Sequence, residues 1–165
     1  MTELGPQLRD LRQRVVRTAL SKQGLPFRHH YKPVNLCGGV FTRQECMEVG
    51  MDGRGFDCSG LVIASVCTAA HVDVREWDDE YRHVPQLMGL SVDTEPEAGD
   101  ALIMRRVTGP RPPRNHMGIL IKTGTIAHAS GKTQKVEIED LETVVEPGSI
   151  LRVVPLSVLI KLAQN

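Results

Sequence analysis

Residues 55–62, Gly-Phe-Asp-Cys-Ser-Gly-Leu-Val, place one cysteine at the start of an apolar run that continues to Ala70. This run predicts a helix that begins at Cys58, with Asp57 as its N-cap. A thiol at a helix start meets backbone N–H groups and the positive end of the helix dipole, which favour the nucleophilic thiolate. Cys58 is therefore the candidate nucleophile.

The elements on either side of this helix follow a simple order. A first amphipathic helix is predicted over Gln7–Gln23, because apolar residues recur there at steps of three and four and Gly24 follows as a stop signal. Trp77–Met88 is predicted to form a surface helix. Short strands are predicted at Ala101–Met104, Met117–Lys122, Thr125–Ala129, Lys135–Ile138 and Ile150–Val154. Helices followed by strands indicate an α+β fold, and 165 residues with 41% hydrophobic content fit a single domain over residues 1–165.

Two segments show neither the helical spacing of apolar residues nor the alternation of a strand. Residues 25–56 are predicted to form a long loop, with a short helix over residues 43–49, and no role is assigned to His29, His30, Cys37 or Cys46 within it. Residues 108–114 contain three prolines and predict a lid or rim loop. Its arginines, at positions 111 and 114, are interpreted as a solvated rim rather than a specific anion site.

The cysteine spacing argues against a metal. The four cysteines include no CxxC pair, so we expect no metal site and no cofactor, and we expect the thiols to be reduced. Cys67 lies nine residues after Cys58, so at 3.6 residues per turn the two side chains are about 180° apart around the helix axis. We therefore interpret Cys67 as a core residue that faces away from Cys58.

The charge balance limits the partners. Twenty basic and twenty acidic residues cancel, so no global field favours nucleic acid or anionic lipid. The apolar runs are too short to span a membrane. The segment Met1–Leu11 is charged and has no apolar centre, so we expect a chain made in the cytoplasm without a signal peptide and exported, if at all, by another route.

Two histidines are the candidate partners of the thiol. A cysteine hydrolase needs a base within hydrogen-bond reach and a group that orients this base. His116 begins one predicted strand and His128 lies on the next, and residues twelve apart across a hairpin share a face only with an odd loop or a bulge. We therefore predict such a loop or bulge near Gly124. In this arrangement His128 fixes the tautomer of His116, and Nε2 of His116 faces Cys58.

Four motifs together resemble those of a known family. Asp57–Leu61, Glu97–Ile103, His116–Ile119 and Ile126–Ala129 resemble, in order and spacing, the successive motifs of the NlpC/P60 cell-wall cysteine peptidases. The resemblance implies a papain-like fold, in which the nucleophile helix packs on an antiparallel sheet of about five strands. It also implies hydrolysis of amide bonds next to γ-D-glutamate in peptidoglycan stem peptides, through an acyl-enzyme thioester.

The resemblance also suggests residue roles. Cys58 corresponds to the nucleophile, with its backbone N–H in the oxyanion hole, His116 to the general base and acid, and His128 to the orienting residue. Pro26-Phe27 stands where relatives often have a Pro-Tyr pair. The implied substrate-binding residues are Asp57, Ser59 and Phe27.

A narrower resemblance concerns delivery. The segments Pro26–His30 and Gly99–Arg105 resemble members associated with phage tails and similar injection machines. This implies a tail or secretion machine as a partner, and action at the cell wall or in the virion. Two alternatives stay open: a catalytically idle structural or assembly module of such a device, and an amidase or acyltransferase of the same fold acting on another substrate. A complete set of triad positions argues against the idle module.

Overall fold

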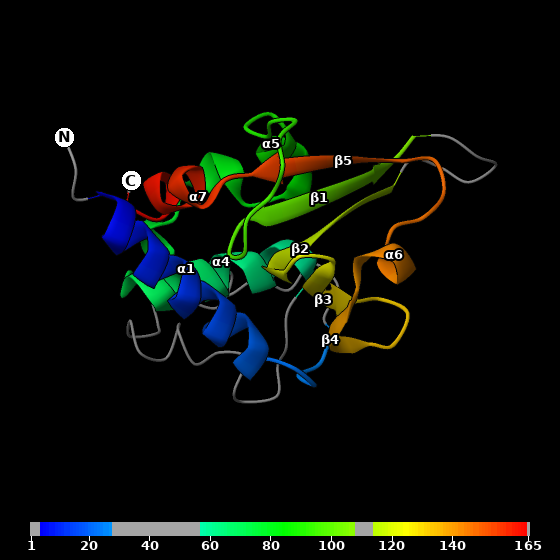
Figure 1. The fold of residues 1–165 in the computed structure, drawn as a ribbon, viewed down its shortest axis with the longest axis horizontal. Coiled ribbons are helices and arrows are strands. Elements are labelled where there is room, and N and C mark those ends of the chain that lie inside the picture. Colours follow the sequence, from blue (N-terminus) through cyan, green and yellow to red (C-terminus); the bar gives the residue numbers. More distant parts are fainter. Residues whose placement is uncertain (1–3, 28–56, 108–113, 165) are drawn as a thin grey trace.

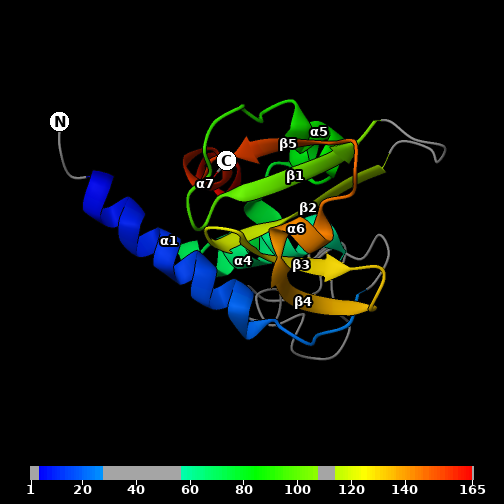
Figure 2. The same ribbon diagram turned by 45° about the vertical axis from the view of Figure 1, so that its right-hand side comes forward.

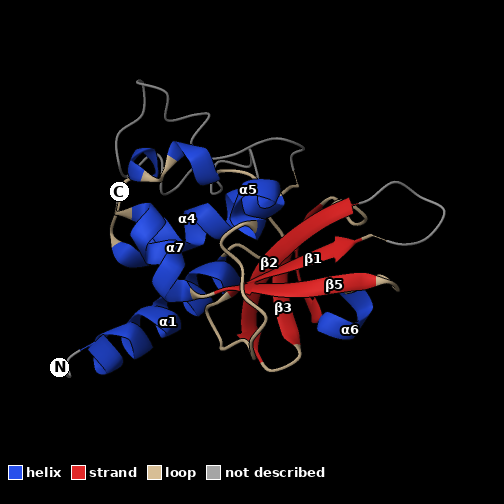
Figure 3. Ribbon diagram, turned by 90° about the horizontal axis from the view of Figure 1, so that it is seen from above, coloured by secondary structure: helices blue, strands red, loops and turns tan. Residues whose placement is uncertain are grey.

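The computed structural model describes residues 4–27, 57–107 and 114–164 of the chain. Within these ranges, α1, α4, α5 and α7 lie on one side of a five-stranded antiparallel sheet of order β4-β3-β2-β1-β5, and α6 lies on the other side (Figures 1 and 3). The main helices are α1 (Leu4–Ser21), α4 (Cys58–Ala70) and α7 (Leu156–Ala163). The strands are β1 (Ala101–Arg106), β2 (Arg114–Lys122), β3 (Thr125–Ser130), β4 (Lys135–Asp140) and β5 (Ser149–Val154). The predicted helices over Gln7–Gln23 and from Cys58 and all five predicted strands are therefore confirmed.

Helix α4 packs against α1 and against β2 and β3 of the sheet (Figure 2). Its residues are mostly small and apolar, and those from Ser59 to Cys67 are all buried. The core against it includes Ile103, Met117 and Ile119 of the sheet. Burying each side chain of this size contributes about 1.5–3 kcal/mol relative to exposure. The core thus fixes the start of α4 relative to β2 and β3.

The two faces of the sheet differ because side chains alternate along each strand. The second face buries Leu102, Leu120 and Ile126 beneath the short helix α6 (Leu141–Val144). The sequence analysis predicted neither α6 nor α7. For α7 the signal was present, since Leu156, Leu159 and Leu162 recur at steps of three and are buried.

The predicted helix over Trp77–Met88 is wrong. This segment contains the 3₁₀ turn η3 (Asp79–Tyr81) and the short helix α5 (Val84–Met88), and the 3₁₀ turn η2 (Val74–Glu76) precedes it. Asp78 caps η3, and the proline in the first turn of α5 begins a new helix. Trp77 is buried, and its indole N–H donates to the carbonyl of Tyr81. The aromatic ring therefore anchors the segment in the core instead of facing solvent.

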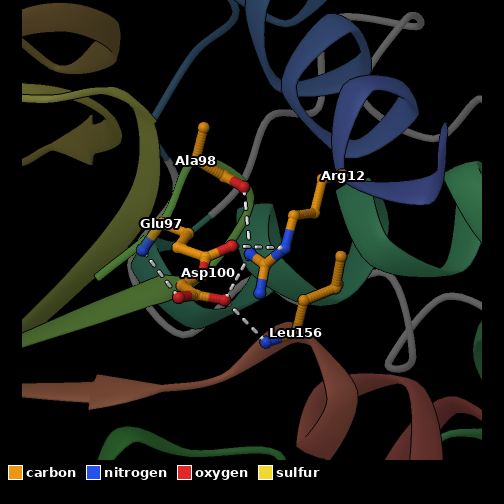
Figure 4. A network of polar contacts seen from close by, with 5 residues as sticks. All are labelled: Arg12, Glu97, Ala98, Asp100 and Leu156. Atoms are coloured by element: carbon orange, nitrogen blue, oxygen red, sulfur yellow. Dashed lines mark hydrogen bonds and ion pairs between the residues drawn. The ribbon is translucent and has the colours of Figure 1, made fainter. Parts of the chain in front are cut away.

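A polar network joins α1 to the start of β1 and of α7 (Figure 4). Arg12 donates to Asp100 at 2.6 Å and to the carbonyl of Ala98 at 3.0 Å, and the amide of Leu156 donates to Asp100 at 2.8 Å. Gly99 has φ +93°, and a Cβ there would lie 3.2 Å from the backbone of Arg12. Asp100 is buried and closes a turn with Glu97, because its amide donates to the carbonyl of Glu97 at 3.0 Å.

No helix in the described ranges is both long enough and apolar enough to cross a membrane. The predicted short helix over residues 43–49 and most of the two predicted loops, residues 28–56 and 108–113, lie outside those ranges. His29, His30, Cys37 and Cys46 lie there as well.

Candidate active site

A bulge in the β2–β3 hairpin brings the two candidate histidines to one face of the sheet. Leu120 pairs with Ile126, whereas Lys122 pairs with Thr125, so one extra residue, Ile121, is inserted in β2. Continuing the first register places His128 across from Gly118, two residues from His116 on the same face. Without the extra residue the two side chains would point to opposite faces. The bulge predicted near Gly124 is therefore confirmed.

The imidazole rings of His116 and His128 are in contact. Nε2 of His116 lies 2.8 Å from Nδ1 of His128, and the ring planes are nearly perpendicular at 83°. The opposite nitrogen of His128, Nε2, lies 2.6 Å from Oε2 of Glu139 on β4. Glu139 pairs with Ile126 in the sheet, so its side chain reaches His128 diagonally. Three neighbouring strands thus carry a chain of three polar groups.

The hydrogen bonds that link Glu139, His128 and His116 determine the tautomers of the two imidazoles. An ionised carboxylate only accepts hydrogen bonds, so Nε2 of His128 donates to Glu139. Nδ1 of a neutral His128 then accepts from Nε2 of His116. The basic lone pair of His116 is consequently on Nδ1. The prediction that Nε2 of His116 faces Cys58 is wrong, because this nitrogen is the one that bonds to His128.

The surroundings keep His116 neutral. Burial lowers the pKa of His116 from 6.5 to about 3, and the electrostatic interactions of His116 with its neighbours His128 and Arg114 act in the same direction. An imidazole with this pKa is unprotonated at neutral pH. His116 therefore holds a free lone pair, as a general base requires.

Cys58 and His116 line the same groove, which has a volume of 290 Å³. Cys58 is half-buried at the first position of α4. Three other lining residues are those predicted to bind substrate: Phe27, Asp57 and Ser59. The structure thus gathers all the predicted site residues except His128, which contacts His116 from behind the groove.

Asp57 shapes the start of the nucleophile helix. Its carboxylate accepts from the amide of Gly60 at 2.7 Å, and its carbonyl accepts from the amide of Leu61 at 3.0 Å. The predicted N-cap is confirmed. A substrate-binding role for Asp57 stays a prediction.

The remaining described cysteine is inert. Cys67 is fully buried, and burial, with the charges of Asp73 and Glu76, raises its pKa to about 12. A thiol of this kind stays protonated and unreactive at neutral pH. The interpretation of Cys67 as a core residue is therefore confirmed.

Sequence reasoning missed some groups at the site. Glu139 and His83 were not singled out, and Arg114 was interpreted as part of a solvated rim, although His83 and Arg114 both line the groove. No cluster of three or more metal-binding side chains occurs in the part of the chain that the structure describes. A larger cavity of 480 Å³ beside α1, lined by Arg9, Arg12 and Arg17 among others, contains none of the candidate catalytic residues.

Comparison with known proteins gives a consistent family assignment. A sequence model of the NlpC/P60 family matches residues 47–151, a range that contains Cys58, both histidines and Glu139. No curated protein matches the chain.

Several solved structures share the fold. RipB, a peptidoglycan hydrolase from Mycobacterium tuberculosis, is 23% identical, with a TM-score of 0.61 over 92% of this chain and 67% of RipB. The P60 domain of the antigen MAP1204 from M. avium subspecies paratuberculosis is 20% identical, with a TM-score of 0.58 over 90% of this chain and 96% of that domain. NlpC2 from Trichomonas vaginalis is 16% identical, with a TM-score of 0.56 over 89% of this chain, which spans only 46% of NlpC2. The predicted α+β, papain-like fold is confirmed by these neighbours.

Proposed function

We propose, because this chain belongs to the NlpC/P60 family, that it is a cysteine peptidase that hydrolyses amide bonds next to γ-D-glutamate in peptidoglycan stem peptides. The observation that carries the proposal is the shared groove of Cys58 and His116, with His116 bonded in turn to His128. A thiol, a neutral base and a group that orients this base are the parts that nucleophilic acyl transfer needs.

Acylation begins with transfer of the Cys58 proton to Nδ1 of His116. The sulfur then attacks the carbonyl carbon of the scissile amide, and a tetrahedral oxyanion forms. The backbone N–H of Cys58, at the positive end of α4, is suited to stabilise this oxyanion. The imidazolium of His116 gives its proton to the leaving amine, the C–N bond breaks, and a thioester joins the acyl group to Cys58.

Deacylation uses the same groups in reverse. His116 takes a proton from water, and the resulting hydroxide attacks the thioester carbonyl. The C–S bond breaks, the sulfur recovers its proton from His116, and a carboxylic acid leaves. His128 and Glu139 hold the His116 ring so that Nδ1 accepts the proton in both half-reactions.

Turnover of a synthetic γ-D-glutamyl peptide with a diamino acid on the amine side tests the proposal. Cys58→Ala and His116→Ala are expected to reduce kcat/KM by about 10³-fold or more while the thermal midpoint stays near that of the wild type. Cys67→Ala is the matched control, since it removes the other thiol of α4 and is expected to retain activity. Undiminished activity in either active-site variant would reject the mechanism.

Mass spectrometry of digested sacculi separates the proposal from its alternatives. Stem-peptide fragments are expected from a peptidase of this specificity, and no release from sacculi is expected from an idle assembly module. An amidase or acyltransferase for another substrate would also leave the sacculi intact. Delivery by a phage tail or secretion machine stays a prediction, and blotting of purified virions and culture fractions for this chain tests it.

A further inference from the structure

We propose that Arg114 binds a free carboxylate of the substrate beside the scissile amide. The enzyme would then act on acyl groups that carry this carboxylate and discriminate against the corresponding carboxamide. This inference rests on the proposed function and assigns a substrate group to one residue of the groove.

Arg114 lines the groove close to His116. It begins β2, two residues before His116, so both side chains leave the same face of the strand. Nη2 of Arg114 lies 3.6 Å from the point where a Cβ on Gly131 would be, and Cζ of Phe27 lies 4.0 Å from the same point. The guanidinium and the Phe27 ring therefore both lie beside Gly131, and all three residues line the groove.

The positive charge of Arg114 acts on the proposed catalytic base, His116. It is one of the causes that lower the pKa of His116. Among the described residues that line the groove, Arg114 is the only lysine or arginine. An anion bound there would offset this charge and make His116 a stronger base in the complex than in the free enzyme.

The ion pair that the guanidinium of Arg114 makes within the protein is weak. Its ion pair with Glu146 is long, at 3.6 Å, whereas Arg106 binds the same carboxylate at 3.0 Å. The Arg114 side chain is 56% exposed, and exposed pairs of this geometry contribute little to stability. A substrate carboxylate can therefore engage the guanidinium without breaking a strong contact.

The hydrogen-bond donors of the Arg114 guanidinium favour a carboxylate over a carboxamide. An arginine fork offers parallel N–H donors that match the two oxygens of a carboxylate. A carboxamide presents one oxygen and an NH₂ group, so one arm of the fork would meet a donor. A glutamate linked through its γ-carbonyl keeps its α-carboxyl group free on the acyl side of the scissile bond. Such a residue supplies the carboxylate that the inference requires.

Two peptides that differ in one group test the inference. Both have the γ-D-glutamyl linkage, and the α-carboxyl is free in one and a carboxamide in the other. The wild type is expected to prefer the free carboxylate by about ten- to a hundredfold in kcat/KM. Arg114→Gln is expected to reduce the preference to near unity, with the larger loss of kcat/KM on the free-carboxylate peptide, and Arg114→Lys is expected to be intermediate.

Arg105→Gln is the matched control, because Arg105 is an exposed arginine of β1 outside the lining of the groove. It is expected to keep the full preference. Equal cleavage of the two peptides by the wild type, or an equal loss on both in Arg114→Gln, would overturn the inference while the proposed function stood. Cleavage of neither peptide by the wild type would overturn the proposed function, and the inference with it.

Discussion

The carboxylate of Glu139 lies 2.6 Å from Nε2 of His128 and thereby determines which nitrogen of that ring carries the proton. Through His128, the same carboxylate places the lone pair of His116 on Nδ1. A residue on β4 that does not line the groove thus sets the direction in which the base accepts a proton.

Glu139→Gln is expected to lower kcat by about ten- to a hundredfold with little change in KM. The neutral amide can still accept from His128, but it no longer stabilises the positive charge that forms on the imidazole pair. The measurement is the pH profile of kcat, which we expect to change shape as well as height.

Glu137→Gln provides the control for this variant. Glu137 lies on the same strand directly across from His128, and its carboxylate pairs instead with Lys135 at 3.5 Å. It is expected to leave kcat within about twofold of the wild type, as surface pairs contribute little. Equal losses in the two variants would show that general charge near β4, and not the bond to His128, matters.

The protein is expected to become less stable as the pH falls, because His116 takes up a proton more readily in the unfolded chain. The unfolded chain takes up a proton on this residue near pH 6.5, whereas the folded chain does so only near pH 3. The unfolded state therefore binds more protons between these values, and the free energy of unfolding decreases as the pH falls from 6.5 to 3. Urea unfolding at several pH values measures this slope.

His116→Gln removes the titrating group from both states. This variant is expected to show a shallower loss of stability than the wild type over the same pH window. An identical pH dependence in the two proteins would mean that His116 is not protected from protonation in the fold.

Gly118→Ala is expected to destabilise the hairpin that carries the histidines. A Cβ at this position would lie 2.4 Å from the carbonyl oxygen of Ala127, which is backbone and must shift. Overpacking of this kind costs about 1–3 kcal/mol. Thermal unfolding measures the loss, and Gly5→Ala is the control because nothing lies within 4 Å of the added Cβ. A wild-type thermal midpoint for Gly118→Ala would contradict the tight contact between β2 and β3.

Asp100→Ala separates structure from catalysis. Removing this carboxylate breaks its buried pair with Arg12, which keeps the carbonyl of Ala98 as an acceptor, and leaves the amide of Leu156 without this bond. Breaking a buried pair costs about 3–5 kcal/mol. The free energy of unfolding is expected to fall by this amount, while kcat per folded molecule, measured well below the thermal midpoint, is unchanged. A selective loss of kcat would place Asp100 in the catalytic machinery.

The sequence contains enough local information to predict most of the fold. Alternation and turn residues locate the five strands, and the need for His116 and His128 to share a face is enough to predict the bulge. The contact with Glu139 depends on how β4 pairs with β3, and Glu137 lies on the same face, so alternation does not distinguish the two carboxylates. The nitrogen of His116 that faces the groove depends on the orientation of the ring, which no spacing pattern encodes.

The alkylation rate of Cys58 by iodoacetamide, followed between pH 5.5 and 8.5 by peptide mass spectrometry, tests most directly whether this thiol is activated by His116. Cys67 in the same molecule is an internal reference, since its buried thiol is expected to stay unmodified while the fold is intact. The account predicts rapid alkylation of Cys58 at neutral pH and a loss of about tenfold or more in His116→Ala. A Cys58 as unreactive as Cys67, or one whose rate is the same without His116, would contradict it.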